Sequence, residues 1–177
     1  MLHSSMIIYQ HAKPEDTLRL SILFQQVYIQ SYALEGITVE FANFISQRFA
    51  PDRIRKTINE QPDSIIVAYN KDHPIGVAEL DFQNKCPIDN LPGAELNKLY
   101  VLERFCSKGI GGNLLKKAEE KAIEKGFAQL WLEVWLENPR AIQFYEKQHY
   151  QPVGVVDFPM ETNTYQNMVM WKELTGI

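Results

Sequence analysis

The stretch that decides the fold of this 177-residue chain is Ser107-Lys108-Gly109-Ile110-Gly111-Gly112-Asn113-Leu114-Leu115. It follows a run typical of a strand and opens a run typical of a helix. N–H groups in the first turn of a helix have no partner inside the helix, and they carry the positive end of its dipole. Glycines let a phosphate approach them without interference from a Cβ atom. Residues 107–112 therefore predict a phosphate-binding loop, although the same glycine pattern also caps helices that bind nothing.

Strand and helix patterns flank this loop on both sides. We expect a strand over 94–102, a helix over 110–125 that ends at Gly126, and a strand over 129–136. A strand–helix–strand unit joins parallel strands by a right-handed crossover. The loop would then lie at the carboxyl end of the first strand, where open sheets bind ligands. The core stripe of the helix should be Leu114, Leu115, Ala118, Ala122 and Ile123.

The whole chain predicts one domain, 1–177, of the mixed α/β class. We expect a largely antiparallel central sheet of about seven strands, with a parallel β-α-β centre and helices on both faces. In the first helix, Leu18, Ile22, Gln25 and Ile29 should share one side, with Leu20, Leu23, Phe24 and Val27 widening the apolar stripe. The other expected strands are 6–11, 64–69, 75–82, 150–156 and 165–172; the other expected helices are 14–35, 40–48, one that starts at Pro51, and 139–148, and 84–93 reads as a loop.

Composition narrows the class of function. A hydrophobic content of 45% and a net charge of −4 fit a globular domain and disfavour a nucleic-acid surface. The mild acidic excess fits a positively charged substrate, or merely an ordinary soluble surface. Cys86 and Cys106 make neither a disulfide scaffold nor a zinc site. No run is long enough to span a membrane, and residues 1–6 do not resemble a secretion signal, so we expect a cytoplasmic protein.

Two separated motifs resemble the GNAT superfamily of acetyl-coenzyme A-dependent N-acetyltransferases. The phosphate loop of that family, [Q/R]-x-x-G-x-[G/A], is matched by Cys106-Ser107-Lys108-Gly109-Ile110-Gly111. Its later motif, an Asn followed by Ala and then Tyr, is matched by Asn138-Pro139-Arg140-Ala141-Ile142-Gln143-Phe144-Tyr145. The resemblance covers residues 64–172. Phe24, Tyr28 and Tyr32, with residues 130–135 and 165–170, are similar to a bacterial branch that includes spermidine/spermine N-acetyltransferases.

The chain departs from the family pattern at three places. Cys106 replaces the Gln or Arg of the loop, so we expect weaker but not lost cofactor binding. His149-Tyr150 replaces the usual Gly-Phe after the last helix, and His tolerates a positive φ better than most residues. Asn97 stands where many relatives carry a Glu that can act as base.

The resemblance implies acetyl-coenzyme A as cosubstrate and no metal. The diphosphate would rest on the loop, and the backbone of the preceding strand would pair with the pantetheine amides. Asn138 would bind the same arm, or would cap the helix that begins at Pro139. The implied cofactor-binding residues are Leu99, Tyr100, Val101, Cys106, Ser107, Lys108, Gly109, Ile110, Gly111, Gly112, Asn138, Arg140 and Tyr145.

Acetyl transfer to an amine needs a base, because a free alkyl amine with a pKa of about 10.4 is almost entirely protonated at neutral pH. Glu133, in Leu-Glu-Val twelve residues before Tyr145, resembles the base of enzymes that acetylate protein N-termini. Glu95 is the other candidate, and it shares a strand face with Asn97. Each of these carboxylates could instead lie at a solvated sheet edge. The resemblance makes Tyr145 the proton donor to the leaving thiolate, although its spacing also fits a core aromatic residue.

The acceptor suggested by the branch resemblance and the acidic balance is a polyamine or another small primary amine. Glu35, Glu79 and Asn97 are the expected substrate-binding residues, and Glu40 could also receive a cationic tail. A protein N-terminus is the alternative acceptor, suggested by Glu133. An acyl-CoA sensor without catalysis is an alternative of a different class. We expect no nucleic-acid or membrane partner, and a homodimer stays open.

Overall fold

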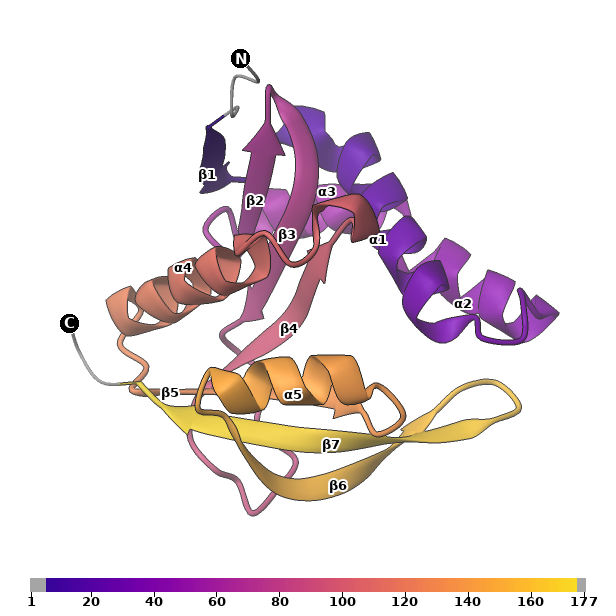
Figure 1. Cartoon of the computed structure of the whole chain (residues 1–177), viewed down its shortest axis with the longest axis vertical. Helices are drawn as coiled ribbons and strands as arrows, with labels where there is room; N and C mark the ends of the chain where they lie inside the picture. The colour runs from indigo at the N-terminus through magenta and orange to yellow at the C-terminus, as the bar shows by residue number, and fades with distance from the viewer. Residues whose placement is uncertain (1–5, 175–177) are drawn as a thin grey trace. The chain divides into compact units, whose positions relative to one another are not determined.

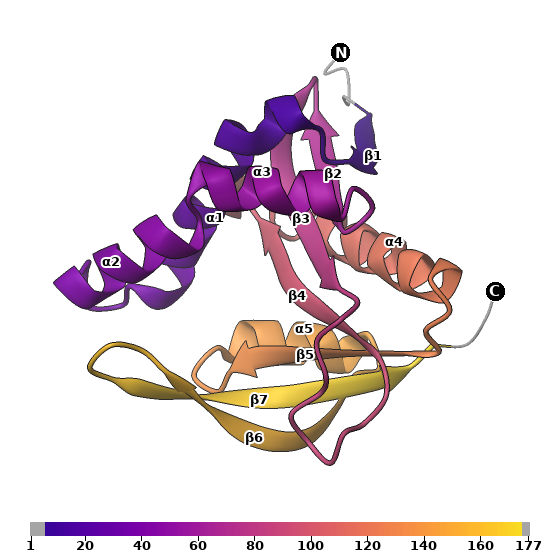
Figure 2. The same cartoon turned by 180° about the vertical axis from the view of Figure 1, so that it is seen from behind.

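The computed structural model describes residues 6–174 (Figures 1 and 2). Residues 1–5, on which most of the expectation about a secretion signal rests, lie outside the described part. The chain groups into two compact units. The first unit comprises the described chain up to Glu79 together with Lys98–Lys117, and the second comprises Leu80–Asn97 and the described chain from Ala118 onward. The expectation of a single domain stays a prediction.

The first unit contains an antiparallel sheet, and the helices α1, α2 and α3 lie between its first and second strands in the chain. Strand β1 pairs with β2 and β2 pairs with β3, all antiparallel. Its elements are β1 (Ile7–His11), the short 3-10 helix η1 (Pro14–Asp16), α1 (Thr17–Tyr32), α2 (Val39–Arg48), α3 (Pro51–Glu60), β2 (Ile65–Asn70), most of β3 (His73–Asp81), the end of β4 (Ala94–Val101), the 3-10 helix η2 (Glu103–Phe105) and the start of α4 (Ile110–Glu124).

The sequence prediction that Leu18 and Ile22 lie on the buried side of α1 is wrong. Leu20 and Phe24 of α1 are buried against residues of β2 and α3, whereas Leu18 and Ile22 are 63% and 59% exposed. Apolar residues occur around almost the whole of α1, so spacing alone does not say which arc faces the sheet. Contact with β2 selects the arc of Leu20, Leu23, Phe24 and Val27, and leaves Leu18 and Ile22 on the outside.

Strand β2 is buried on both faces, which explains its continuous apolar sequence. Ile65 and Val67 pack in the core that α1 and α3 complete. Figures 1 and 2 show these helices on one face of β2 and β3, and the first turns of α4 on the other. Close approach of α4 depends on Gly76 of β3, where an added Cβ would lie 3.1 Å from both Leu114 Cδ1 and the Tyr100 carbonyl oxygen.

The second unit contains a mixed sheet, a loop over residues 82–93, a helix that follows β5 (Gln129–Trp135), and the part of α4 from Ala118 onward. The first residues of β4 belong to this unit and run parallel to β5, with Ala94 opposite Leu130 and Glu95 opposite Trp131. β5 pairs antiparallel with β7 (Thr164–Glu173), which pairs antiparallel with β6 (Gln151–Pro159). Among residues 6–174, the seven strands follow the hydrogen-bonded order β1-β2-β3-β4-β5-β7-β6. This confirms the expected mixed sheet and its parallel centre.

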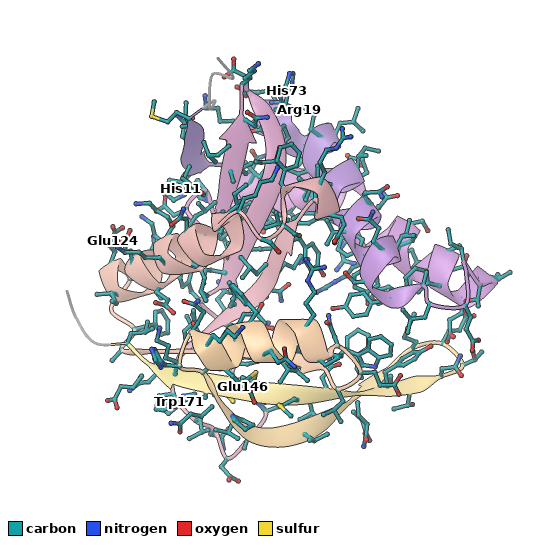
Figure 3. The ribbon with its side chains drawn as sticks, viewed as in Figure 1. His11, Arg19, His73, Glu124, Glu146 and Trp171 are labelled. Carbon is teal, nitrogen blue, oxygen red and sulfur yellow. The ribbon has the colours of Figure 1, made fainter. Side chains whose placement is uncertain are left out.

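Helix α5 (Pro139–Lys147) and the loop 82–93 lie on opposite faces of β5 and β7 (Figures 1 and 2). Under the loop, Cys86, Trp131 and Val169 are buried together. The indole N–H of Trp171, labelled in Figure 3, donates a hydrogen bond of 2.9 Å to the Pro92 carbonyl. The loop is therefore packed down onto the sheet along its length. Within residues 6–174, no helix combines the length and apolarity that crossing a membrane requires.

We predict that Gly76→Ala destabilises the protein by about 1–3 kcal/mol, because the new methyl group overpacks the contact between β3 and α4. The matched control is Gly112→Ala, whose Cβ would meet no heavy atom within 4 Å and whose helical position favours alanine. Urea denaturation of the ligand-free protein measures both. A Gly76→Ala variant as stable as the wild type would contradict the close-packing argument.

Candidate functional site

The glycine loop lies between the end of β4 and the start of α4, as predicted. Ser107 and Gly109 adopt positive φ angles of 60° and 78°, which turn the chain sharply before the helix begins at Ile110. The Gly109 carbonyl accepts the N–H of Asn113 at 3.0 Å, so Gly109 is the N-cap of α4. Ile110 is buried and holds this first turn against the core.

The first turn of α4 is suited to an anion. The N–H groups of residues 110–112 have no acceptor within the helix, and the helix dipole places positive potential there. A Cβ built on Gly109 or on Gly112 would meet no heavy atom within 4 Å, so the space beside both backbones is open. The exposed Lys108 adds a cation, and its Nζ lies 5.3 Å from the centre of the Phe105 ring. These features fit a bound phosphate group.

Cys106, at the head of the loop, is turned back toward the strand that precedes it. Its Sγ lies 3.6 Å from the Val101 carbonyl oxygen and 3.7 Å from that of Leu102. Tyr100 packs edge-on against Phe24 in the core of the first unit, with ring centres 5.9 Å apart. Burial raises the pKa of the Tyr100 hydroxyl well above its ordinary value. The predicted cofactor role of Tyr100 therefore rests on its backbone.

Glu95, in the second unit, is a buried carboxylate with only 8% of its surface exposed. The side-chain amide of Asn84 donates a hydrogen bond of 2.6 Å to its Oε2. Burial raises the pKa of the Glu95 carboxyl, and the charges of Asp81 and Glu133 act in the same direction. Hydrogen bonds from Asn84 and Asn97 act in the opposite direction. Glu95 is thus less acidic than an exposed glutamate and ionises at higher pH.

The register of the second unit brings Glu133 onto the same sheet face as Glu95. Glu95 pairs with Trp131, and alternation along β5 gives Trp131 and Glu133 a common face. The Asn167 side-chain amide donates to Glu133 Oε2 at 3.1 Å. Trp131 is buried, and its indole N–H has no acceptor among the described residues. Both predicted bases therefore lie near each other beneath the loop 82–93, with an unused donor beside them.

Tyr145 belongs to α5, which covers the opposite face of the same strands. It is 8% exposed, and its ring centre lies 5.8 Å from that of Tyr150. The Tyr150 hydroxyl donates to Glu119 Oε1 at 3.0 Å, and Lys172 Nζ donates to the same oxygen at 2.7 Å. This polar group fixes the aromatic pair from the side of α4 and β7. Tyr145 therefore has the burial of a core residue, and its catalytic role stays a prediction.

Asn138 and His149 behave at the two ends of α5 as the sequence predicted. Asn138 Oδ1 accepts the Ala141 N–H at 3.1 Å, which confirms the N-cap interpretation. Its contact with the cofactor arm stays a prediction, as does the role of the exposed Arg140. His149 adopts a φ of 69°, so the turn that usually requires glycine is kept.

The predicted substrate residues lie in different places. Glu35 is exposed between α1 and α2, where Leu34 and Ile37 are exposed as well. Asn97 is half-buried next to Glu95 in the second unit. Glu79 is largely buried and forms an ion pair with Lys98, with 3.0 Å between Oε2 and Nζ.

Sequence reasoning overlooked Lys98. Its Nζ lies 5.5 Å from the centre of the Phe24 ring, inside the first unit. Alternation places Lys98 on one strand face with Leu96 and Tyr100. A lone lysine on such an apolar face is the signal that could have predicted a buried ion pair with a carboxylate. Among residues 6–174, no group of three or more His, Cys, Asp or Glu side chains could hold a metal ion.

Comparisons with known proteins agree with these motifs. The model of the Acetyltransferase (GNAT) family matches residues 31–150. An uncharacterized N-acetyltransferase of Archaeoglobus fulgidus is 29% identical over 127 residues, which span 71% of this chain and 82% of the relative.

Solved structures share the fold. A PaiA N-acetyltransferase from Thermoplasma acidophilum, in complex with coenzyme A, has a TM-score of 0.77 at 22% identity, covering 95% of this chain and 99% of that one. A ribosomal-protein-alanine N-acetyltransferase from Brucella melitensis has a TM-score of 0.69 at 21% identity, covering 94% and 99%. The likeness to a spermidine/spermine branch stays a prediction, whereas the family model decides the broader question: this chain belongs to the acetyltransferase (GNAT) family.

Proposed function

We propose that this protein transfers an acetyl group from acetyl-coenzyme A to a primary amine, and that the loop 107–112 binds the diphosphate of the cofactor. The observation that carries the proposal is the first turn of α4, where Gly109 caps the helix, the backbone N–H groups of residues 110–112 have no acceptor within the helix, and the space beside Gly109 and Gly112 is open. Family membership supports the reaction. Val101 and Leu99, at the end of β4, would pair through their backbones with the pantetheine amides.

Glu95 is the base that the second unit supports best. The acceptor amine is protonated at neutral pH, so a group of the enzyme has to remove a proton before nitrogen can attack the thioester carbon. A buried carboxylate with a raised pKa holds that proton more readily than an exposed one does. Glu133, held by Asn167, is the second candidate and would act directly or through water.

Tyr145 is the proposed proton donor. As the new carbon–nitrogen bond forms and the carbon–sulfur bond breaks, the departing thiolate of coenzyme A takes the hydroxyl proton of Tyr145. A protonated amine loses two protons, one to the base before attack and one from the nitrogen as the amide forms. One of the two replaces the proton that Tyr145 gives to the thiolate, and the other leaves to solvent, so protons balance. Tyr145 on α5 and Glu95 under the loop lie on opposite faces of the second unit.

A polyamine or another small amine is our proposed acceptor. The net charge of −4 and the exposed Glu35 support a cationic substrate. Because Lys98 already neutralises Glu79, we assign Glu79 a smaller part in holding a cationic tail. A protein N-terminus is the alternative, favoured by Glu133 in its Leu-Glu-Val setting. Free-thiol release with spermidine, small diamines and N-terminal peptides separates these acceptors. The cytoplasmic location and a homodimer stay predictions.

We predict that Gly111→Asp abolishes binding of coenzyme A, because it places a negative charge and bulk at the first turn of α4. Isothermal titration calorimetry measures the loss. Asn59→Asp, at an exposed position of α3, adds the same charge elsewhere and should bind like the wild type. Unchanged affinity in Gly111→Asp would remove the loop as the diphosphate site.

We predict that Tyr145→Phe lowers kcat by roughly 10²-fold or more while the affinity for coenzyme A stays within about 2-fold, because only the proton donor is lost. Tyr165→Phe, at an exposed position of β7, is the matched control and should keep full turnover. A sensor that only binds acyl-CoA has no turnover to lose. A Tyr145→Phe enzyme with wild-type kcat would exclude Tyr145 as the donor.

We predict that the two carboxylates differ in their pH–rate profiles. Since the pKa of Glu95 is raised, activity that depends on its ionised form falls as the pH drops through that value, above the usual glutamate range of about 4.3. Glu95→Gln should abolish this acidic limb and lower kcat/KM by roughly 10²-fold or more, whereas Glu133→Gln should keep the limb. The reverse pattern would make Glu133 the base.

A further inference from the structure

The loop 82–93 is anchored on the second unit at points spread along its length. Cys86 is 2% exposed, and the Trp171 indole donates to the Pro92 carbonyl at 2.9 Å. At Gly154 of β6, an added Cβ would lie 2.5 Å from Ile88 Cδ1, so the loop and this strand are in close contact. A segment held in this way presents its side chains in fixed positions.

The first residues of the loop form a turn that directs the side chain of Asn84 toward Glu95. Asp81 Oδ1 accepts the backbone N–H groups of Gln83 and Asn84, at 2.7 Å and 2.8 Å. This is the arrangement in which an aspartate fixes the chain two and three residues ahead. The side-chain amide of Asn84 then reaches Glu95 Oε2 at 2.6 Å. Asn84 itself is exposed, so the burial of hydrophobic surface does not account for its placement.

The groups around Glu95 mostly disfavour its charged form, so the hydrogen bond from Asn84 matters for keeping Glu95 ionised. Negative or potentially negative groups on three segments act on the carboxylate: Asp81 of β3, Glu133 of β5 and the Cys86 thiol of the loop. Burial also disfavours its charged form. Asn84 and Asn97 are the side chains that favour the charged form, and the hydrogen bond from Asn84 is the stronger of the two influences. No lysine or arginine acts on Glu95 among these influences.

We propose that Asn84 is a positioning residue: the hydrogen bond from its side-chain amide holds the Glu95 carboxylate in the orientation in which it accepts a proton from the amine. The inference rests on the proposed function, because it takes Glu95 as the base. It adds a residue that touches neither acetyl-coenzyme A nor the amine, and it gives the anchored loop 82–93 a part in catalysis.

The test compares kcat/KM of Asn84→Ala and Asn84→Asp with that of the wild type between pH 5.5 and pH 9. Without its donor, Glu95 holds its proton to higher pH, so the loss should be on the order of 10-fold at pH 6 and should fall to within about 2-fold at pH 9. Asn84→Asp keeps the size of the side chain and adds a negative charge, so its loss at pH 6 should be larger. Taking the ratio to the wild type removes the ionisation of the free amine, which both enzymes share.

Gln83→Ala is the control, since Gln83 is exposed and contributes only its backbone N–H to the turn. It should stay within about 2-fold of the wild type at every pH. An equal loss at all pH values in Asn84→Ala, or no loss, would overturn the positioning role. If Glu95→Gln keeps the acidic limb, the assignment of the base fails as well. If Glu95→Gln abolishes the limb while Asn84→Ala leaves it in place, only the inference about Asn84 fails.

Discussion

The close approach of α4 to β3, which the missing side chain of Gly76 permits, is the constraint on which the phosphate loop depends. Leu114 and the end of β4 occupy the space that a Cβ at Gly76 would need. Because Ile110 is also buried, the first turn of α4 has little freedom to shift. Its unused N–H groups are therefore held in place before any anion binds, and little entropy remains to be lost when one does. The positive φ of Gly109 completes this arrangement.

The second unit contains a buried carboxylate, Glu95, whose negative charge has to be stabilised. Glu95 has lost most of its contact with water, and a buried carboxylate needs hydrogen bonds to stay ionised. Amide side chains supply them, from Asn84 to Glu95 and from Asn167 to Glu133. Amides stabilise a carboxylate without the full charge that an arginine would bring, so the group keeps its affinity for a proton. That property is what a base for an amine requires.

Local sequence patterns were enough to predict most of the fold. The glycine loop, the cap at Asn138 and the left-handed turn at His149 each depend on neighbouring residues, and the structure confirms them. The parallel pair of β4 and β5 was predicted from the order strand, helix, strand, and it is confirmed as well. Side-chain contacts between distant segments were not predictable in this way. The exposure of Leu18 and Ile22 depends on which arc of α1 meets β2. The pair Lys98–Glu79 joins two strands, and the pair Asn84–Glu95 joins a loop and a strand. No periodic pattern in the sequence predicts either partner.

The central claim is that backbone amides at the start of α4 bind the diphosphate of coenzyme A. It is tested most directly by titrating ¹⁵N-labelled protein with coenzyme A and, separately, with pantetheine, which lacks the diphosphate. We predict that the amide resonances of Gly109, Ile110, Gly111 and Gly112 shift with coenzyme A and stay in place with pantetheine. Resonances that stay in place with coenzyme A while other amides shift would contradict the claim.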